Sequence, residues 1–277
     1  MTTGKLYVCP TPIGNLDDMT IRVLNTLKSV DLIAAEDTRH TLKLLNHFDI
    51  KNKLFSYHEH NKTTAGPQLI DRLFEGLDIA LVSDAGMPGI SDPGEDLVRL
   101  CIEASIDVIA LPGPSAVVTA LAASGLSTRR FLFEGFLDRN KKVKNERLEY
   151  LKPIKETIVF YESPHRLLET FKTFKKVFGN RQIVVAREIS KRFEEYYRGS
   201  IDECSTYFEN KGIKGEFVLL LEGNSEEIIE TFEMTIEEHL LSEMALGLSK
   251  KEAISSVSKI RKIPKKEVYQ IAIDLKK

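Results

Sequence analysis

The stretch "LVSDAGMPGISDPG", residues 81–94, decides the fold of this chain. An apolar run leads directly into a loop that holds two aspartates, three glycines and two prolines. Such a run is typical of a buried strand, and open α/β sheets bind ligands at the carboxyl ends of their strands. Asp92, Pro93 and Glu95 predict the N-cap, first and third positions of a helix. For Asp84 two roles stay open, namely capping of the turn and contact with a ligand.

Strand patterns and helix patterns alternate on both sides of this loop. Four short apolar runs, "KLYVC", "VDLIAAE", "DIALVSD" and "DVIALPG", are separated by amphipathic segments up to about residue 118. Alternation of this kind predicts βαβ units and a mostly parallel sheet. We therefore expect an N-terminal α/β domain over residues 1–118.

A second apolar series predicts a second α/β domain over residues 119–224. Its strands are expected in "RFLFEGFL", "ETIVFYES", "RQIVVARE", "EYYRGS" and "GEFVLLLEG", with helices at about 142–151, 164–178 and 201–210. The short spacing between "ARE" and "YYRGS" leaves no room for a parallel crossover, so this sheet should be mixed.

Residues 225–277 carry no strand pattern and predict a small helical unit. Ser249 and Glu252 form a capping box, which indicates the start of one helix, and Pro264 indicates the start of another. The expected apolar stripes are Ala253-Val257-Ile260 and Val268-Ala272-Leu275.

Composition is ordinary for a soluble globular protein. The chain has 277 residues, 42% of them hydrophobic and 29% charged, with a net charge of −2. No segment approaches the roughly 20 apolar residues of a membrane span, and the N-terminus lacks the pattern of a signal peptide. Three widely spaced cysteines suit a reducing cytoplasm. The charge gives no global basic surface, so any nucleic-acid contact must be local.

Familiar nucleotide-binding fingerprints are missing. The chain contains neither G-x-x-x-x-G-K-[ST] nor a G-x-G-x-x-G after its first strand, which disfavours a P-loop and a standard dinucleotide site. Instead, three Pro/Gly-shaped loops should lie at one sheet edge, at residues 10–14, 83–94 and 112–115. In the third, Ser115 is expected to cap a helix that starts at Ala116, whose N–H groups would face the crevice.

These loops carry a family resemblance. "YVCPTPIGNLDDMTIR", "DLIAAEDTRHT", "ALVSDAGMPGISDPG", "LPGPSAVVTAL", "FEGFL", "FYESPHRL" and "ARE" closely resemble the tetrapyrrole methylase-like superfamily, and within it the ribosomal RNA small subunit methyltransferase I branch. The resemblance covers residues 5–222, and the C-terminal segment resembles the terminal helical piece of that branch. It implies a homodimer of two-domain α/β chains that uses S-adenosylmethionine, bound in a cleft between the domains. It also implies 2′-O-methylation of a cytidine in 16S rRNA near the decoding centre.

The resemblance also implies a set of cofactor contacts. Where the branch is expected to have threonine after "DAG", this chain has Met87, which keeps a backbone or packing contact but not a hydroxyl contact. Taken alone, Tyr161 in "ETIVFYES" is equally compatible with a core position. The implied cofactor-binding residues are Pro10, Asp84, Met87, Ser115, Ala116, Tyr161, Glu162 and Glu216.

Methyl transfer to a ribose hydroxyl requires a positioned nucleophile and a group that takes its proton. "AEDTR" and "AREISK" follow strand ends and supply Glu36, Glu188 and Lys191 as candidates. A lysine needs a lowered pKa for this role, through desolvation and neighbouring positive charge. The alternative is an ion-pair network across the cleft, and the sequence does not single out one base.

Two further patterns have competing interpretations. His58 and His60 in "YHEHN" are two residues apart, but no third ligand stands at a recognisable metal spacing, so we favour a polar substrate-side loop and expect no metal. Basic runs at 139–147 and 259–266 are either solvated faces or phosphate contacts, and the terminal helices either dock on RNA or only pack. The expected RNA-binding residues are Arg39, Lys141, Lys142, Lys144, Lys262 and Lys265.

Three functions therefore compete. An S-adenosylmethionine-dependent 16S rRNA methyltransferase agrees with the motifs and the basic segments. A small-molecule methylase of the same fold, acting on a tetrapyrrole precursor, needs only a roomy cleft. A non-catalytic RNA-binding adaptor would lack the cofactor altogether.

Overall fold

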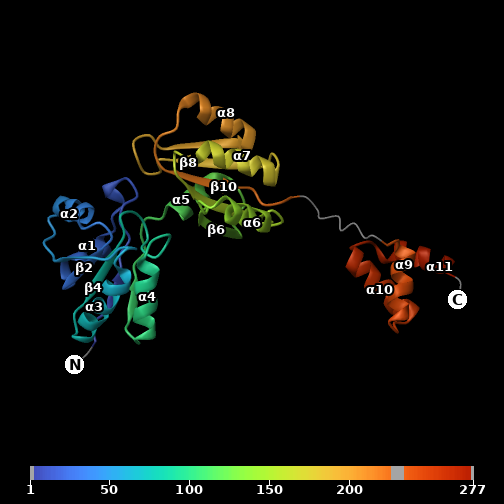
Figure 1. Cartoon of the computed structure of the whole chain (residues 1–277), viewed down its shortest axis with the longest axis horizontal. Helices are drawn as coiled ribbons and strands as arrows, with labels where there is room; N and C mark the ends of the chain where they lie inside the picture. Colours follow the sequence, from blue (N-terminus) through green and yellow to red (C-terminus); the bar gives the residue numbers. More distant parts are fainter. Residues whose placement is uncertain (1–2, 226–233, 276–277) are drawn as a thin grey trace. The chain divides into compact units, whose positions relative to one another are not determined.

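The computed structural model describes residues 3–225 and 234–275, which divide into a first compact unit, Met1–Asn224, and a second, Ser225–Lys277. The first unit contains two separate five-stranded sheets, one within residues 6–110 and the other within residues 131–221 (Figure 1). Within the described ranges, no helix is both long and apolar enough to cross a membrane.

The first sheet is entirely parallel, with the order β3-β2-β4-β1-β5. Its layers are visible in Figure 1, where helices cover both faces of the strands. The strands are β1 (Leu6–Val8), β2 (Leu32–Ala35), β3 (Leu54–Ser56), β4 (Ile79–Val82) and β5 (Val108–Ala110). The helices are α1 (Ile21–Ser29), α2 (Thr38–His47), α3 (Lys62–Phe74) and α4 (Gly94–Glu103), with a short 3-10 helix, η1 (Leu16–Asp18).

Alternation of strands and helices predicted four of these five strands, and β3 was missed. Its three residues are partly or fully exposed and lie at the sheet edge, so the apolar signal of a buried parallel strand is weak there. In contrast, β2 and β4 are buried at every position, which produces the continuous apolar runs that the sequence shows.

The second sheet is mixed, with the order β6-β7-β10-β8-β9, and only the β6–β7 pair is parallel. The antiparallel β8–β9 pair confirms the prediction drawn from the short "ARE" to "YYRGS" spacing. The strands are β6 (Phe131–Phe136), β7 (Thr157–Glu162), β8 (Gln182–Arg187), β9 (Glu195–Ser200) and β10 (Phe217–Leu221). The helices α6 (Lys141–Leu151), α7 (Leu167–Phe178) and α8 (Ile201–Lys211) share one core with this sheet.

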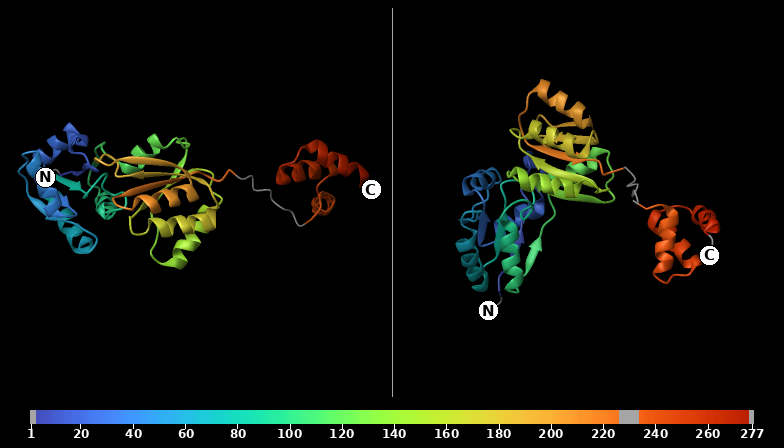
Figure 2. Two further views of the ribbon diagram at one scale, coloured as in Figure 1. Left: turned by 90° about the horizontal axis from the view of Figure 1, so that it is seen from above. Right: turned by 45° about the vertical axis from the view of Figure 1, so that its right-hand side comes forward.

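One helix joins the two sheets. By connection α5 (Ala116–Ser124) follows β5 of the first sheet, but it packs on the second sheet, whose strands lie between helices on both sides (Figure 2). Val117, Ala120 and Leu121 are buried there against side chains of β7, β8 and β10. The helix ends at Gly125, whose φ of 83° is the left-handed conformation that closes a helix without a Cβ penalty. Arg198 of β9 donates hydrogen bonds to the last carbonyls of α5, at Ala123 and Ser124.

The second unit contains α9 (Ile236–Ala245), α10 (Lys250–Arg261) and α11 (Lys265–Asp274) around a core of its own. The Ser249–Glu252 capping box is present, as is a second box formed by Thr235 and Glu238. The predicted stripe on α10 was wrong in its last member, because Ile260 is 41% exposed while Ile254 is buried. The stripe on α11 holds, with Val268 and Ala272 buried and Leu275 packed against them.

The packing of α5 leads to a stability prediction. Leu121→Ala should lower the free energy of unfolding by roughly 2–5 kcal/mol, because it opens a cavity between α5 and the second sheet. Ile102→Ala on α4 should change it by less than about 0.5 kcal/mol, since Ile102 is 64% exposed. Denaturant titration of the full chain measures both values, and equal effects would contradict the proposed anchoring role of this helix face.

Candidate functional site

The functional loops meet where the first sheet reverses its strand order. From β1 the chain moves toward β2 and β3, and from β4 it moves the other way to β5, so adjacent β1 and β4 flank a switch point. Ligands of open α/β sheets bind at such points. Thr11 and Gly86 fasten the two loops together by reciprocal backbone hydrogen bonds of 2.9 and 3.0 Å, and the Thr11 hydroxyl donates to the Ser83 carbonyl.

A cavity of about 410 Å³ opens at this point, within the range of small-molecule sites. Its lining comes from the loop after β4, the start of α5, and the ends of β6, β7 and β10. The predicted cofactor residues that line it are Asp84, Met87, Ser115, Ala116, Tyr161, Glu162 and Glu216. The exception is Pro10, which is buried behind the third loop, where a Cβ on Gly113 would meet its ring at 2.3 Å.

Three carboxylates lie on the wall formed by the first sheet. Burial, together with the negative charges of Asp84 and Asp92, raises the pKa of Glu36 above its ordinary value. Burial likewise raises the pKa of Asp92, in spite of backbone hydrogen bonds that favour its ionised form. Asp84 accepts a hydrogen bond of 3.1 Å from the amide of Asp37, so it ties the β4 loop to the end of β2. The wall therefore favours a cationic group.

The predicted helix cap at Asp92 was wrong by one residue. The N-cap of α4 is Pro93, and Gly94 is the first helical residue. Asp92 instead accepts hydrogen bonds from the amides of Gly89 and Gly94, at 2.8 and 2.7 Å. It thus closes the turn that precedes the helix and also lines the cavity.

The start of α5 forms a wall of opposite character. Ser115 occupies the predicted N-cap position, but its hydroxyl makes no capping hydrogen bond. Ser115 and Ala116 line the cavity, and the first amides of this nine-residue helix are hydrogen-bond donors without an intrahelical partner at the positive end of the helix dipole. A carboxylate is the group that such a terminus binds best.

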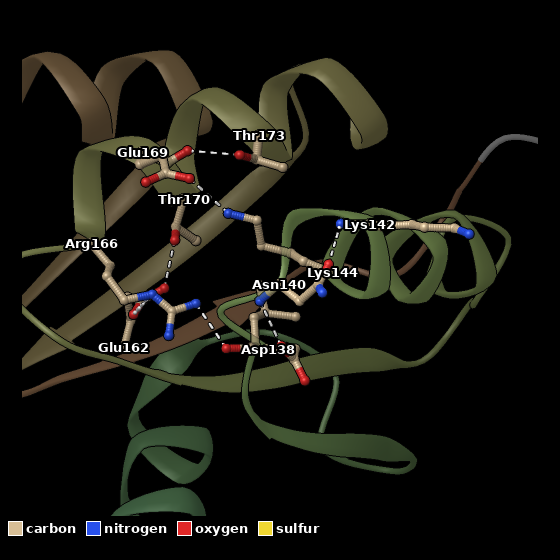
Figure 3. A network of polar contacts seen from close by, with 10 residues as sticks. Asp138, Asn140, Lys142, Lys144, Glu162, Arg166, Glu169, Thr170 and Thr173 are labelled. Carbon is tan, nitrogen blue, oxygen red and sulfur yellow. Dashed lines mark hydrogen bonds and ion pairs between the residues drawn. The ribbon is translucent and has the colours of Figure 1, made fainter.

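The wall from the second sheet is aromatic and polar. Burial raises the pKa of Tyr161 to about 12, and its ring packs edge-on against Phe133 and at a tilt against Phe136. The carboxylate of Glu162 is buried and already bonded, to the Thr170 hydroxyl at 2.5 Å and to the Ser163 amide at 2.8 Å (Figure 3). Glu162 can therefore fix this wall but has little capacity for a ligand.

The candidate bases are in different environments. Lys191 contacts Glu188 at 3.0 Å and Glu216 at 2.9 Å. Burial alone would lower the pKa of Lys191, but these two ion pairs raise it, so the expected lowering is wrong. Burial raises the pKa of Glu188, yet its hydrogen bonds with Lys191 and the Glu216 amide outweigh this and lower it. The three side chains form an ion-pair network, and of the candidates only Glu36 lies in the cavity with a raised pKa.

The basic run at 139–147 contains residues held in ion pairs within the domain and residues that are exposed to solvent. Figure 3 shows Lys144 directed toward Glu169, at 2.8 Å, and Lys142 directed away from the network. Because Lys144 is only 6% exposed, its predicted role in phosphate binding is wrong. Arg147 is likewise held, by a bidentate pair with Glu134. Of the predicted residues of this run, Lys141 and Lys142 are exposed.

The remaining predicted residues are not among those that line the cavity. Arg39 is fully exposed at the start of α2 and pairs with Asp37 at 3.2 Å. Lys262 ends α10 in a left-handed conformation, and Lys265 begins α11, both in the second unit. The His58 and His60 rings lie 5.9 Å apart, and the described part of the chain holds no group of three potential metal ligands.

Sequence reasoning missed several lining residues. Ser83, Ile90 and Ser91 belong to the quoted loop but carried no chemical pattern of their own. Phe136 lies after a bulge in β6, where Gly135 has a φ of 72° and approaches Ser91 closely. The "FEGFL" motif was the available signal for this contact between the two sheets.

Comparison with known proteins agrees with the geometry. The model of the tetrapyrrole (corrin/porphyrin) methylases matches residues 5–205. Ribosomal RNA small subunit methyltransferase I of Halalkalibacterium halodurans is 52% identical over 97% of this chain and 94% of its own length. The protein of the same name from Bacillus subtilis is 48% identical over 96% and 93%.

Solved structures share the fold at low identity. Cobalt precorrin-4 methyltransferase superposes with a TM-score of 0.58 and 18% identity, over 79% of this chain and 94% of that one. A uroporphyrin-III C-methyltransferase from Thermus thermophilus, solved with S-adenyl homocysteine, gives 0.56 and 14%, over 79% and 97%.

The raised pKa of Glu36 predicts a pH-dependent stability difference. A raised pKa means that the folded state favours the protonated carboxyl, so the contribution to stability is present below the ordinary value of 4.5 and lost as pH rises through the folded value. Glu36→Gln should therefore be more stable than the wild type at neutral pH, and this advantage should shrink as pH falls toward 4.5. Denaturant titrations across pH measure it, with Glu103→Gln on the surface of α4 as control. A difference that does not change with pH would contradict the assigned environment.

Proposed function

This chain belongs to the tetrapyrrole (corrin/porphyrin) methylase family, and within it to the ribosomal RNA small subunit methyltransferase I group, and from that membership we propose that it methylates rRNA of the small ribosomal subunit. The methyl donor is S-adenosylmethionine, and the enzyme acts in the cytoplasm. The observation that carries the proposal is the two-sided cavity, with carboxylates on one wall and a helix N-terminus on another.

The donor set fits the groups of this cofactor. When bound, S-adenosylmethionine supplies an electrophilic methyl group on a sulfonium cation. Ser115 and the first amides of α5 would hold the amino-acid carboxylate, and Asp84 would hold a hydroxyl or cationic group. Met87 and Tyr161 offer apolar surface for the adenine. Pro10 supports this arrangement from behind the third loop, and Glu162 through its bonds to Thr170 and Ser163.

The acceptor is the 2′-hydroxyl of a cytidine in 16S rRNA near the decoding centre. Glu36 is the base, because its raised pKa makes its carboxylate a stronger proton acceptor than an ordinary glutamate and because it faces the cavity. Glu36 would take up the proton of the hydroxyl, while the cofactor would supply the methyl group to the ribose oxygen, lose its sulfur–methyl bond and leave as S-adenosylhomocysteine. Lys191 stays protonated between Glu188 and Glu216, and of these three residues Glu216 lines the cavity.

The RNA and a second copy of the chain use the outer surface. Arg39, Lys141, Lys142, Lys262 and Lys265 contact phosphates. The chain is a homodimer, and a candidate interface surrounds a polar cavity lined by Thr20, Thr119 and Glu194, because the neighbouring apolar side chains are exposed. These neighbours are Ile21, Val118 and Phe193, at 77%, 59% and 68% exposure. Sedimentation velocity at micromolar concentration tests the dimer, and a monomer would contradict it.

Asp84→Ala should strongly weaken the binding of S-adenosylmethionine while the fold persists. Loss of a hydrogen bond to a charged group costs roughly 1.5–3 kcal/mol, or about ten- to hundredfold in affinity. The turn itself should survive, because Asp92 and the Thr11–Gly86 pair hold it. Titration calorimetry measures the affinity, with Asp71→Ala on the exposed face of α3 as control. If the variant binds the cofactor with wild-type affinity, Asp84 only stabilises the turn and does not contact the cofactor.

The proposed substrate is tested in cells. Mass-spectrometric mapping of small-subunit rRNA from a strain without this chain should lack one ribose methylation, and the gene for the wild-type chain should restore it. Glu36→Gln should restore it poorly, whereas Glu103→Gln should restore it fully. An unchanged methylation map would favour a small-molecule methylase, and a chain that binds no S-adenosylmethionine would favour the adaptor.

A further inference from the structure

The second unit has a groove whose lining residues have no role in the proposed methyl transfer. It lies between α10 and α11 and has a volume of about 750 Å³. Its floor is apolar, formed by Ile254, Ala272 and Ile273 with the ring of Tyr269. Tyr269 and Ile273 of α11 are more than half exposed, at 56% and 54%. Val268 and Ala272 of the same helix are buried in the core of the second unit.

Four lysines border this floor, namely Lys250, Lys251, Lys265 and Lys266. None of them forms an ion pair with any described residue, in contrast to Lys144 and Lys191 of the first unit. Lys250 reaches the carbonyl of Leu275 near the end of α11, while Lys265 stands at the start of that helix. The lysine pairs are thus separated by about 14 Å along α11, at about 1.5 Å per residue.

The charges of the second unit are segregated. From residue 249 to residue 266 the chain has seven lysines and arginines and one glutamate, whereas α9 has three glutamates and no lysine or arginine. The groove therefore lies on the basic side of a unit whose total charge is small. The four lysines favour an anionic ligand, and the ring of Tyr269 favours a ligand with flat apolar groups.

We propose that this groove binds single-stranded RNA, with a base stacked on Tyr269 and neighbouring phosphates held by the lysine pairs at its two ends. A basic groove that follows the backbone and an aromatic ring that stacks a base are the two elements of single-strand recognition. Duplex RNA hides its base faces and would leave the Tyr269 platform unused. The proposal rests on the proposed function in that the substrate is rRNA, but it concerns a separate site on the second unit.

The experiment uses the full chain and a short, labelled single-stranded RNA of mixed sequence, with binding followed by fluorescence anisotropy over a series of salt concentrations. The double variant Lys265→Ala with Lys266→Ala should weaken binding and flatten the log–log salt slope by about 1.4, or about 0.7 for each lost phosphate contact. Lys172→Ala with Lys176→Ala, two exposed lysines of α7, removes the same charge elsewhere and should leave affinity and slope unchanged.

Substitutions of Tyr269 separate stacking from simple apolar contact. Tyr269→Leu keeps apolar bulk without a π-face and should weaken binding about fivefold or more at every salt concentration, with the slope unchanged. Tyr269→Phe keeps the ring and should bind as the wild type does. Because Tyr269 and both lysines are exposed, circular dichroism should show an unchanged helix content in all variants.

Several outcomes would overturn the groove as a single-strand site. These are wild-type affinity and slope in the lysine variant, equal binding by the Leu and Phe variants, or tighter binding of duplex RNA that is insensitive to Tyr269. Methyl transfer to small subunits is measured on the same preparations. If the wild type transfers methyl groups and the groove variants still bind RNA normally, the proposed groove site is wrong and the proposed function stands. If the wild type transfers none but the variants lose RNA binding, the groove stands and the proposed function fails.

Discussion

The packing of α5 on the second sheet is the interaction on which the site depends. The helix sequence "AVVTALAAS" is apolar on nearly all sides, so it lacks the amphipathic pattern of a surface helix. That composition suits a helix whose first turn faces a cavity and whose body is covered by a sheet from another part of the chain. Because α5 follows β5 directly, its burial fixes the loops of the first sheet against the second. Ser115 is therefore positioned by the core of one sheet and the backbone of the other.

The carboxylates of the site are in two electrostatic environments, one without a neighbouring cation and one with a lysine. The negative charge of Asp84 contributes to the raised pKa values of both Glu36 and Asp92, and the residues that line the cavity include no lysine or arginine. Glu188 and Glu216 are balanced by Lys191. An unbalanced acidic wall lowers the stability of the protein alone and is relieved when a cation binds, which is a common compromise at functional sites. The ion pairs of Lys191 with Glu188 and Glu216 hold these side chains in place, and they make proton transfer to or from them unfavourable.

The sequence predicted those features that depend on neighbouring residues. Continuous apolar runs revealed β2 and β4, and the capping box revealed the start of α10. Features that depend on distant partners could not be seen. Lys144 is buried only because Glu169, 25 residues away, meets its ammonium group, and in the sequence it is one of several lysines in a basic run. β3 is too short for its pattern to emerge, and Glu162 needed Thr170 to show that its carboxylate is occupied. The cavity residues of the second sheet came from the family motifs, because a tyrosine on a strand has no distinctive spacing.

The acidic wall has a consequence for an RNA substrate. A site that favours a sulfonium also repels phosphates, and at physiological ionic strength this repulsion extends about 8 Å before salt screens it. In the proposed reaction, a ribose presented to Glu36 would bring its flanking phosphates within that distance, so the reaction itself would contribute unfavourably to RNA binding. The required affinity must then come from phosphate contacts beyond the screening length. On α6, Lys141 and Lys142 are exposed and do not line the cavity, and the lysines that border the groove belong to the second unit. A net charge near zero is thus compatible with the proposed RNA binding, because the carboxylates line the cavity and these lysines do not.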